Sequence, residues 1–381
     1  MAKYKLCEIF ELQMGKTPDR HNADFWTKGT EPWISIADLS KCGKYIEKTA
    51  ESISEEAVAK SGIKIIPSDT VVMSFKLSIG KVAITPKAMY SNEAVMAFIS
   101  KGVIHIEPTY LYYLLMHHDW EAGTNKAVMG KTLNKATLSE ITVNVHEPIE
   151  QLAIVRVLDK ASAIIDARRQ QLVELDNLVK ARFVEMFGDP ELNDKGYEVK
   201  NLSEIAAYWN GLTYKPENVQ DQGTIVLRSS NIQDGQLDFS DLVRVDCAIR
   251  EKQYVKDNDI LMCSRNGSAR LVGKVALIKD LPEPMSFGAF MMIIRSKYYP
   301  YLLTYFQMDA FRRQIVTGAT TTINQITGNM LNQVKLPIPP RYDIEQFAAF
   351  VAQVDKSKVA VQKALDEVQT LFDSLMQQYF G

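Results

Sequence analysis

The chain repeats itself, and this repeat restricts the folds that it can adopt. The segment "SIGKVAI", which begins at Ser78, returns 193 residues later as "LVGKVAL" at Leu271. The flanks repeat as well, from "LCEIFELQMGK" at Leu6 and "LSEIAAYWNGL" at Leu202 to the endings "VEMFG" and "MQQYFG". Ordered matches at an offset of 193 to 196 residues indicate two copies of one folding unit in tandem.

Each copy reads as a mixed α/β module followed by a long helix. Residues 71–73, 81–84 and 94–99 have the length and composition of strands. Pro108 and Pro300 stand before helical segments at corresponding places, and proline suits the first turn of a helix. A chain of 381 residues is long enough for two such modules with their helices. The sequence therefore predicts a mixed α/β fold class with two tandem α+β domains.

The helical part of each copy carries an apolar seam. Residues 150–187 contain neither proline nor glycine, and apolar residues recur there at intervals of seven. Seams sustained over four heptads favour a coiled coil over a helix that lies on a sheet. The predicted seam residues are Leu158, Ile165, Leu172, Val179 and Met186 in the first copy and Phe347, Val354, Val361, Val368 and Leu375 in the second.

We expect the two helices to pack on each other as a pair of long antiparallel coiled-coil helices. Because each helix follows an equivalent domain, this pairing gives the repeat an internal pseudo-twofold axis. The alternative is that each helix packs back on its own domain. The expected boundaries are 1–148 for the first domain, 149–188 for its helix, 189–340 for the second domain and 341–381 for the second helix.

The cations are unevenly distributed along a chain of globular composition. Formal net charge is −2, with 46% hydrophobic and 24% charged residues. Residues 122–139, 262–274 and 310–342 each contain several lysines or arginines and no acid. Local basic loops of this kind are compatible with a nucleic-acid partner even where the overall charge is slightly negative.

The sequence argues against secretion and against a membrane partner. The first residues lack the apolar core of a secretory signal, and no run of about 18 apolar residues is present. Cys7, Cys42, Cys247 and Cys263 are scattered without a CxxC pair, which is typical of reduced thiols rather than of disulfides or zinc ligands. We therefore expect a cytoplasmic protein.

Motifs of catalysis are missing or incomplete. "GKT" occurs at Gly15 and Gly130, but Phe10 and Asn125 replace the glycine that a phosphate-binding loop needs five positions earlier. "LPIPPR" at Leu336 is the nearest approach to an amino-methyltransferase loop, and it lacks the acid or amide and the aromatic residue. The sequence has no GxSxG turn and no HExxH or other spaced ligand set. We expect no catalytic residue and no metal site in this chain.

The basic loops do contain the side chains that contact DNA. Arginine pairs with guanine, asparagine and glutamine pair with adenine, and hydroxyls and lysine contact phosphate. An ordinary solvated loop is the alternative for each single residue, but basic loops at corresponding places in both copies favour DNA. Residues 262–274 are expected to form the tip of a hairpin. The candidate DNA-binding residues are Lys16, Thr17, Arg20, Lys76, Ser78, Lys131, Thr132 and Asn134 in the first copy and Tyr214, Lys215, Arg228, Ser229, Asn231, Arg265, Asn266, Ser268, Arg270, Thr320, Thr321, Thr322 and Asn324 in the second.

These segments together resemble the specificity subunit of bacterial type I restriction–modification systems. "GKTPDRHNADFWTKGTEPWISIADL" is similar to the start of a target recognition domain in that family, and "GTIVLRSSNIQDGQLD" is similar to a variant opening. "NGSARLVGKVAL" and "LPIPPRYDIEQFAAFVAQVDK" are similar to the domain core and its exit into the helix. The likeness covers almost the whole chain. It departs from the usual pattern at "NVHEPIEQLAI", where a Leu-Pro-Pro exit is typical, and at "YKPENV", where the first copy keeps Thr-Pro.

The resemblance implies a chain that does no chemistry of its own. Each target recognition domain would read one half of a split site in double-stranded DNA. Two modification (methyltransferase) subunits and ATP-dependent restriction subunits would be its partners. S-adenosylmethionine, ATP and Mg²⁺ would be bound by those partners, and no cofactor would be bound by this chain. Two alternatives stay open, namely a stand-alone DNA-modifying enzyme and a coiled-coil scaffold with two ligand-binding modules.

Overall fold

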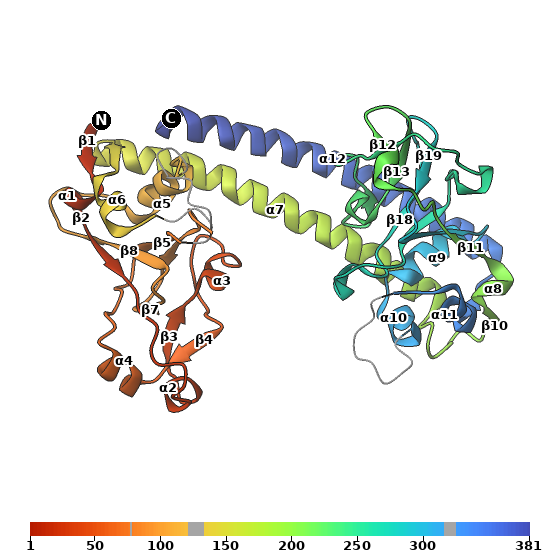
Figure 1. Ribbon diagram of the computed structural model, residues 1–381, viewed down its shortest axis with the longest axis horizontal. Helices are drawn as coiled ribbons and strands as arrows, with labels where there is room; N and C mark the ends of the chain where they lie inside the picture. The colour runs from red at the N-terminus through yellow and green to blue at the C-terminus, as the bar shows by residue number, and fades with distance from the viewer. Residues whose placement is uncertain (77, 121–132, 316–324) are drawn as a thin grey trace. The chain divides into compact units, whose positions relative to one another are not determined.

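The computed structural model describes residues 1–76, 78–120, 133–315 and 325–381. Packing divides the chain into a first unit, Met1–Arg169 with Lys363–Gly381, and a second unit, Gln170–Gln362. Both termini belong to the first unit (Figure 1). This division does not follow the domain boundaries expected at residues 148 and 340, because each of the two long helices contributes one part to each unit.

The two units are built from short strands and short helices that precede each long helix. The elements of the first unit are β1 (Ala2–Lys5), α1 (Leu6–Ile9), β2 (Phe10–Met14), α2 (Asp24–Thr27), β3 (Glu31–Ile34), α3 (Ile36–Leu39), β4 (Glu51–Ile53), α4 (Glu55–Ser61), β5 (Thr70–Ser74), β6 (Val82–Thr85), β7 (Tyr90–Ser91), β8 (Val95–Ser100), α5 (Pro108–His117), α6 (Lys135–Glu140), β9 (Thr142–Val145) and the start of α7 (Pro148–Phe187). The second unit contains the end of α7 and β10 (Glu198–Asn201), α8 (Leu202–Ile205), β11 (Ala207–Asn210), η1 (Pro216–Asn218), β12 (Val219–Gln220), β13 (Thr224–Leu227), η2 (Ser229–Asn231), β14 (Ile232–Gln233), β15 (Gln236–Leu237), β16 (Arg244–Val245), η3 (Glu251–Gln253), β17 (Ile260–Cys263), η4 (Ala269–Leu271), β18 (Val275–Leu277), β19 (Met285–Phe287), β20 (Met291–Arg295), α9 (Tyr299–Phe306), α10 (Asp309–Ile315), α11 (Gly328–Gln333), β21 (Lys335–Ile338) and the start of α12 (Arg341–Phe380). The end of α12 belongs to the first unit.

Each unit is centred on a four-stranded antiparallel sheet. The strand order is β2–β8–β5–β6 in the first unit and β11–β20–β17–β18 in the second. A second sheet in each unit contains a parallel pair, β3 with β7 and β13 with β19. It has one further, antiparallel strand in the first unit (β4) and two in the second (β16 and β12). Because the same pairing pattern occurs twice, the repeat seen in the sequence is a repeat of the fold.

The predicted local structure is confirmed for the segments that the sequence singled out. The strands expected at 71–73, 81–84 and 94–99 are β5, β6 and β8, with each end differing by one residue. Helix α5 begins at Pro108, and α9 has Pro300 in its first turn. Every residue of β5 is buried, because successive side chains of a strand point to opposite faces and both faces of this sheet are covered.

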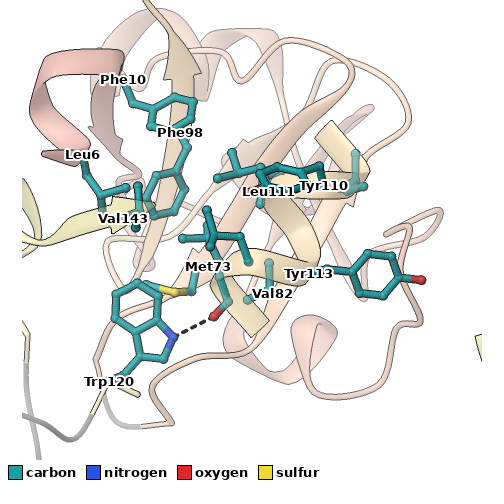
Figure 2. Packing of buried hydrophobic residues seen from close by; sticks show 14 of the residues in the cluster. Leu6, Phe10, Met73, Val82, Phe98, Tyr110, Leu111, Tyr113, Trp120 and Val143 are labelled. Carbon is teal, nitrogen blue, oxygen red and sulfur yellow. Dashed lines mark hydrogen bonds between the residues drawn. The ribbon is translucent and has the colours of Figure 1, made fainter. Parts of the chain in front are cut away.

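The core of the first unit lies between the main sheet and α5. Met73 of β5 and Phe98 of β8 face Tyr110 and Leu111 of α5 in one buried cluster (Figure 2). The rings of Phe10 and Phe98 meet edge to face, with centroids 5.8 Å apart.

The long helices take part in this core. Leu158 and Ile165 of α7 lie in the same buried cluster as Phe372 and Met376 of α12. Tyr113 of α5 joins them, because its ring centroid is 6.1 Å from that of Phe372. In this unit the start of α7 therefore packs both on its own domain and on the end of α12.

A polar cluster also ties α7 to the first domain. The Tyr113 hydroxyl donates to Oδ1 of Asp159 at 2.6 Å, and Lys44 Nζ pairs with the same oxygen at 2.6 Å. Burial raises the pKa of Tyr113 well above its usual range, and the hydrogen bond to Asp159 adds to this shift. The phenol therefore stays protonated and keeps its role as donor.

The second unit repeats this arrangement with the helices exchanged. Phe183 and Phe187 near the end of α7 pack against Phe347 of α12 and Tyr301 of α9. Ring centroids are 4.9 Å apart for Phe183 and Tyr301 and 5.7 Å apart for Phe183 and Phe347. The start of α12 therefore packs on its own domain and on the end of α7.

The predicted seams are only partly buried, and one polar residue interrupts the packing. Lys358 occupies a seam-like position of α12, its side chain is 15% exposed, and its ammonium pairs with Asp176 of α7 in the same unit. The buried seam residues are Leu158, Ile165, Val179, Phe347, Val354 and Val361, and the half-buried ones are Leu172, Met186, Val368 and Leu375.

Replacing Phe347 tests the helix packing in the second unit. We expect Phe347→Ala to lower the free energy of unfolding by about 3–5 kcal/mol, because the ring is fully buried among aromatic partners. Tyr342→Ala, on the same helix but 67% exposed, should change it by about 0.5 kcal/mol or less. Urea denaturation followed by circular dichroism measures both values, and equal losses would contradict the packing described.

Candidate nucleic-acid interface

The basic loops expected to contact DNA lie at the same place in the two units. In the first unit, residues 75–81 connect β5 to β6, where Val82 pairs with Met73. The loop is closed by two hydrogen bonds, since the amide of Ser74 donates to Lys81 O and the amide of Gly80 donates to Ser74 O, both at 2.9 Å.

The second unit has the same closure around a longer loop. Residues 264–274 connect β17 to β18, where Val275 pairs with Met262, so the expected hairpin is confirmed. The amide of Cys263 donates to Lys274 O and the amide of Gly273 donates to Cys263 O, again at 2.9 Å. By this register Lys76 of the first loop corresponds to Arg265 of the second.

A further segment of each copy is attached to these loops. The amide of Leu133 donates to Phe75 O at 3.2 Å, and the amide of Ile326 donates to Ser264 O at 2.7 Å. Phe75 and Ser264 are equivalent in the register, so the described end of a second basic segment joins the hairpin in both units. The predicted contacts Lys131, Thr132, Thr320, Thr321, Thr322 and Asn324 in those segments lie outside the described residues.

Three predicted cations in these loops form no ion pair within the described parts of the chain, although Lys76 lies close enough to Glu93 to contribute to its lowered pKa. No carboxylate oxygen of the described residues lies within 4.0 Å of Lys76, Arg265 or Arg270. Arg265 and Arg270 are exposed, and Lys76 is half-buried with its Nζ 5.2 Å from the Phe75 ring centroid. Such side chains are available to an anionic ligand such as a phosphate or to the acceptors of a base edge.

Other predicted contacts in the first unit are engaged in its own fold. Arg20 forms two hydrogen bonds to Glu51, at 2.5 and 3.0 Å, and its guanidinium carbon lies 3.6 Å from the Trp26 ring centroid. Lys16 donates from Nζ to a backbone carbonyl, Ser61 O. These residues shape the domain, and a role for them in DNA binding stays a prediction.

Three more residues of the first unit have internal partners. Thr17 donates to Glu93, and this hydrogen bond holds the pKa of Glu93 below its usual range. The Asn134 side chain accepts from the amide of Thr137 at 2.8 Å and caps α6. Ser78 is exposed, and its carbonyl accepts from the buried hydroxyl of Ser74, which fixes the loop.

In the second unit the predicted contacts divide in the same way. Asn231 is fully buried, and its amide donates to the carbonyls of Asp238 and Asp241 at 2.9 Å. Arg228 pairs with Asp241 at 2.8 Å. These two residues brace a turn, whereas sequence reasoning assigned them to DNA.

The structure does bring some of the predicted residues together. The Asn266 amide donates to the hydroxyl of Ser229 at 3.1 Å, and the amide of Ser268 donates to Asn266 Oδ1 at 2.9 Å. The two loops that carry them, 37 residues apart in the chain, therefore form one surface. Two further predicted contacts, Tyr214 and Lys215, lie in another segment. Tyr214 is half-buried, and Lys215 Nζ lies 3.6 Å from Oε1 of Glu217.

Sequence reasoning missed one residue of this surface. Phe290, in the turn between β19 and β20, is 60% exposed and lies beside the β17–β18 hairpin. Its sequence signal was the segment "FGAFMM", where the first copy has "SNEAVM" and Ala94 is buried. The difference between Phe290 and Ala94 can be recognised only when the two copies are aligned by the register of their strands.

The described residues contain neither a membrane-spanning helix nor a cluster of metal ligands. No helix among them is long and apolar enough to span a bilayer. Within the same residues, histidine, cysteine, aspartate and glutamate side chains form no group of three that could hold a metal ion.

These features define a class of protein. Its members have a duplicated α+β domain, with a basic hairpin at the end of the main sheet of each copy and a long helix after each domain. A family model described as the type I restriction modification DNA specificity domain matches residues 1–177 and 194–369. The chain therefore belongs to the family of type I restriction–modification DNA specificity proteins.

Individual relatives agree with this membership. The MjaIX specificity subunit of Methanocaldococcus jannaschii is 23% identical over an alignment of 404 positions, which covers 98% of this chain and 90% of the relative. The StySPI specificity subunit of Salmonella potsdam is 30% identical over 182 residues, covering 44% of this chain and 39% of the relative.

Solved structures are similar in fold. The S subunit of a type I restriction–modification system from M. genitalium gives a TM-score of 0.52 at 15% identity, covering 100% of this chain and 96% of that one. A chain from a structural study of complex assembly and conformational transition in a type I system gives 0.54 at 14% identity, covering 99% and 96%.

Substituting Gly80 tests the loop geometry. Gly80 has φ +83°, and an added Cβ would come within 2.9 Å of Trp120 Cδ1. We expect Gly80→Ala to cost about 1–2 kcal/mol of unfolding free energy, since a left-handed residue with a side chain is strained. Gly43→Ala, where no atom lies within 4 Å of the added Cβ and φ is not positive, is the matched control. Urea denaturation compares them, and a neutral Gly80→Ala would show that the loop adopts another conformation.

Proposed function

We propose that the chain is the DNA-binding specificity subunit of a type I restriction–modification complex and reads a bipartite target in double-stranded DNA. The observation that carries this proposal is the pair of equivalent hairpins. Each places a cation that forms no ion pair within the described residues, Lys76 or Arg265, at the same position of the same sheet edge. Family membership supports DNA as the ligand.

In this proposal residues 1–148 and 189–340 are the two target recognition domains, and each reads one half-site. Residues 149–188 and 341–381 are the spacer helices, paired antiparallel as a coiled coil. The packing within each unit supports that pairing, because the start of one helix contacts the end of the other in both.

The helix length suits the role of a spacer. Helices α7 and α12 have 40 residues each, which corresponds to about 60 Å. Half-sites read on one face of DNA lie about 34–36 Å apart for each helical turn. A stiff helix pair of this length can hold two recognition domains over separate major grooves.

Catalysis belongs to other subunits in this proposal. Two modification subunits supply adenine methylation with S-adenosylmethionine, and restriction subunits supply ATP- and Mg²⁺-dependent translocation and cleavage. This chain binds no cofactor and selects the site. Methylation or cleavage of DNA by the purified chain alone would favour a stand-alone enzyme.

Two arginines of the second hairpin provide a direct test. Arg265→Ala or Arg270→Ala should weaken or relax recognition of one half-site by about 1–3 kcal/mol, if the side chain contacts a base. Sequencing of methylated adenines in cells that express the complex measures this effect at every genomic site. Lys76→Ala should affect the other half-site, and unchanged methylation in all three variants would contradict the assignment of these loops.

The spacer role predicts a change in target geometry. Four residues inserted after Arg169 in α7 lengthen the helix by about 6 Å and turn it by about 40° beyond a full turn. We expect methylation to move to a target with a different spacer length or to be lost. An equal insertion after Gly102, in an exposed turn, should leave the target unchanged. A target with its original spacing after the α7 insertion would refute the spacer role.

A further inference from the structure

Among the described residues, four arginines have a guanidinium over an aromatic ring. In such an arrangement the ring attracts the cation and restricts the plane of the guanidinium. The distances from the guanidinium carbon to the ring centroid are 3.6 Å for Arg20 and Trp26, 5.7 Å for Arg182 and Phe350, 5.5 Å for Arg265 and Phe290, and 4.9 Å for Arg295 and Trp209.

Three of these four pairs are completed by a carboxylate. Glu51 binds Arg20 at 2.5 and 3.0 Å, and Asp259 binds Arg295 at 2.6 and 2.7 Å. Glu185 accepts from Arg182 at 2.8 Å. In these pairs the ring lies on one side of the guanidinium and an acid forms an ion pair with it, so the charge of the arginine is paired within the fold.

The fourth pair has the ring without the acid. Within the described ranges no carboxylate oxygen lies within 4.0 Å of Arg265, and its side chain is exposed. Phe290 is also 60% exposed, although a fully apolar side chain of this size gains free energy from burial. Among the described residues of its own domain, no side-chain hydrogen bond or ion pair engages the guanidinium of Arg265, whose carbon lies 5.5 Å from the Phe290 ring centroid.

The backbone holds this pair firmly in place. The carbonyl of Phe290 accepts from the amides of Ser264 and Arg265 at 2.9 and 3.0 Å and from the Ser264 hydroxyl at 2.9 Å. Arg265 also forms an antiparallel bridge with Gln325. Arg265 follows the end of β17 by two residues, and Phe290 directly precedes β20. Backbone hydrogen bonds therefore connect the two residues next to the ends of paired strands.

We infer that Phe290 is a positioning residue that presents Arg265 to a guanine in the DNA half-site read by residues 189–340. The inference rests on the function proposed above and names the base that this part of the surface reads. Guanine offers O6 and N7 as two acceptors in the major groove, which match the fork of an arginine. A guanidinium already oriented by a ring loses less conformational entropy when it binds this edge.

The first unit provides an internal comparison. Ala94 occupies the place of Phe290, since its carbonyl accepts from the amide of Phe75 at 3.0 Å as that of Phe290 does from Ser264. The cation there is Lys76, which has a single ammonium and no planar fork. Phe290→Ala therefore gives the second unit a side chain that the fold already accommodates at the equivalent place.

The experiment compares Phe290→Ala, Phe290→Leu, Phe290→Tyr and Arg265→Ala in the full chain, assembled with its modification subunits. Phe239→Ala is the control, because Phe239 is an exposed phenylalanine (39%) elsewhere in the same domain. Genome-wide sequencing of methylated adenines gives the target of each variant. Competition binding with oligonucleotides that differ at single base pairs then gives the preference for guanine at each position.

We expect Phe290→Ala and Phe290→Leu to reduce the preference for guanine by about three- to tenfold at the base pair that Arg265→Ala relaxes. Phe290→Tyr keeps the ring face and should retain the target, and Phe239→Ala should be unchanged. Positions in the other half-site should keep their preferences, which a general loss of stability would not produce. Thermal unfolding confirms that the variants are folded.

The possible failures are distinct. An unchanged target in Phe290→Ala, or relaxation at a base pair other than that of Arg265, overturns the positioning role and leaves the proposed function intact. The same holds if Phe290→Leu retains the target, because the ring face is then not needed. An Arg265→Ala variant with an unchanged target also overturns the inference, because Arg265 then does not contact the guanine. A wild-type complex without any sequence preference refutes the proposed function itself.

Discussion

Apolar side chains of α7 and α12 are shared between two hydrophobic cores, and the rest of the structure depends on this sharing. Leu158 and Ile165 are buried with Phe372 in the first unit, and Phe183 is buried with Phe347 in the second. Neither core is complete without residues from the other repeat. Because burying large apolar side chains is the dominant gain in folding, each domain requires the partner helix as well as its own.

The hairpins proposed to contact DNA extend from buried strands of these domains. The hairpins after β5 and β17 leave strands whose residues are entirely buried, and the same backbone hydrogen bonds close both loops. Position is thus fixed by the sheet, while the side chains beyond it are free to differ. A surface built this way can change its ligand preference without loss of the core, since exposed substitutions have small effects on stability.

The sequence was sufficient for the repeat, the strands, the long helices and the hairpin, because these features depend on periodicity and turn residues that are local. It was insufficient for the roles of single polar residues. Arg20 and Arg265 both lie over an aromatic ring, and the sequence does not distinguish their roles. In the structure Arg20 is paired with Glu51, whereas Arg265 has no such carboxylate among the described residues. Asn231 was assigned to DNA for its chemistry, but it is buried by contacts that are 7 to 10 residues away and depend on the turn geometry. The sharing of each helix between two cores was also hidden, since a heptad seam does not reveal which surface covers it.

Duplication followed by divergence at equivalent positions explains how one scaffold can serve two different ligand surfaces. The register pairs Lys76 with Arg265 and Ala94 with Phe290, on loops of different length, 75–81 and 264–274. A lysine offers one mobile charge, whereas an arginine held against a ring offers an oriented fork, so the two edges differ in what they can discriminate. The fold is conserved between the copies because both cores require it. In the proposed function, two identical recognition domains would restrict the chain to symmetric sites, whereas different surface residues allow the two halves of a bipartite target to differ in sequence.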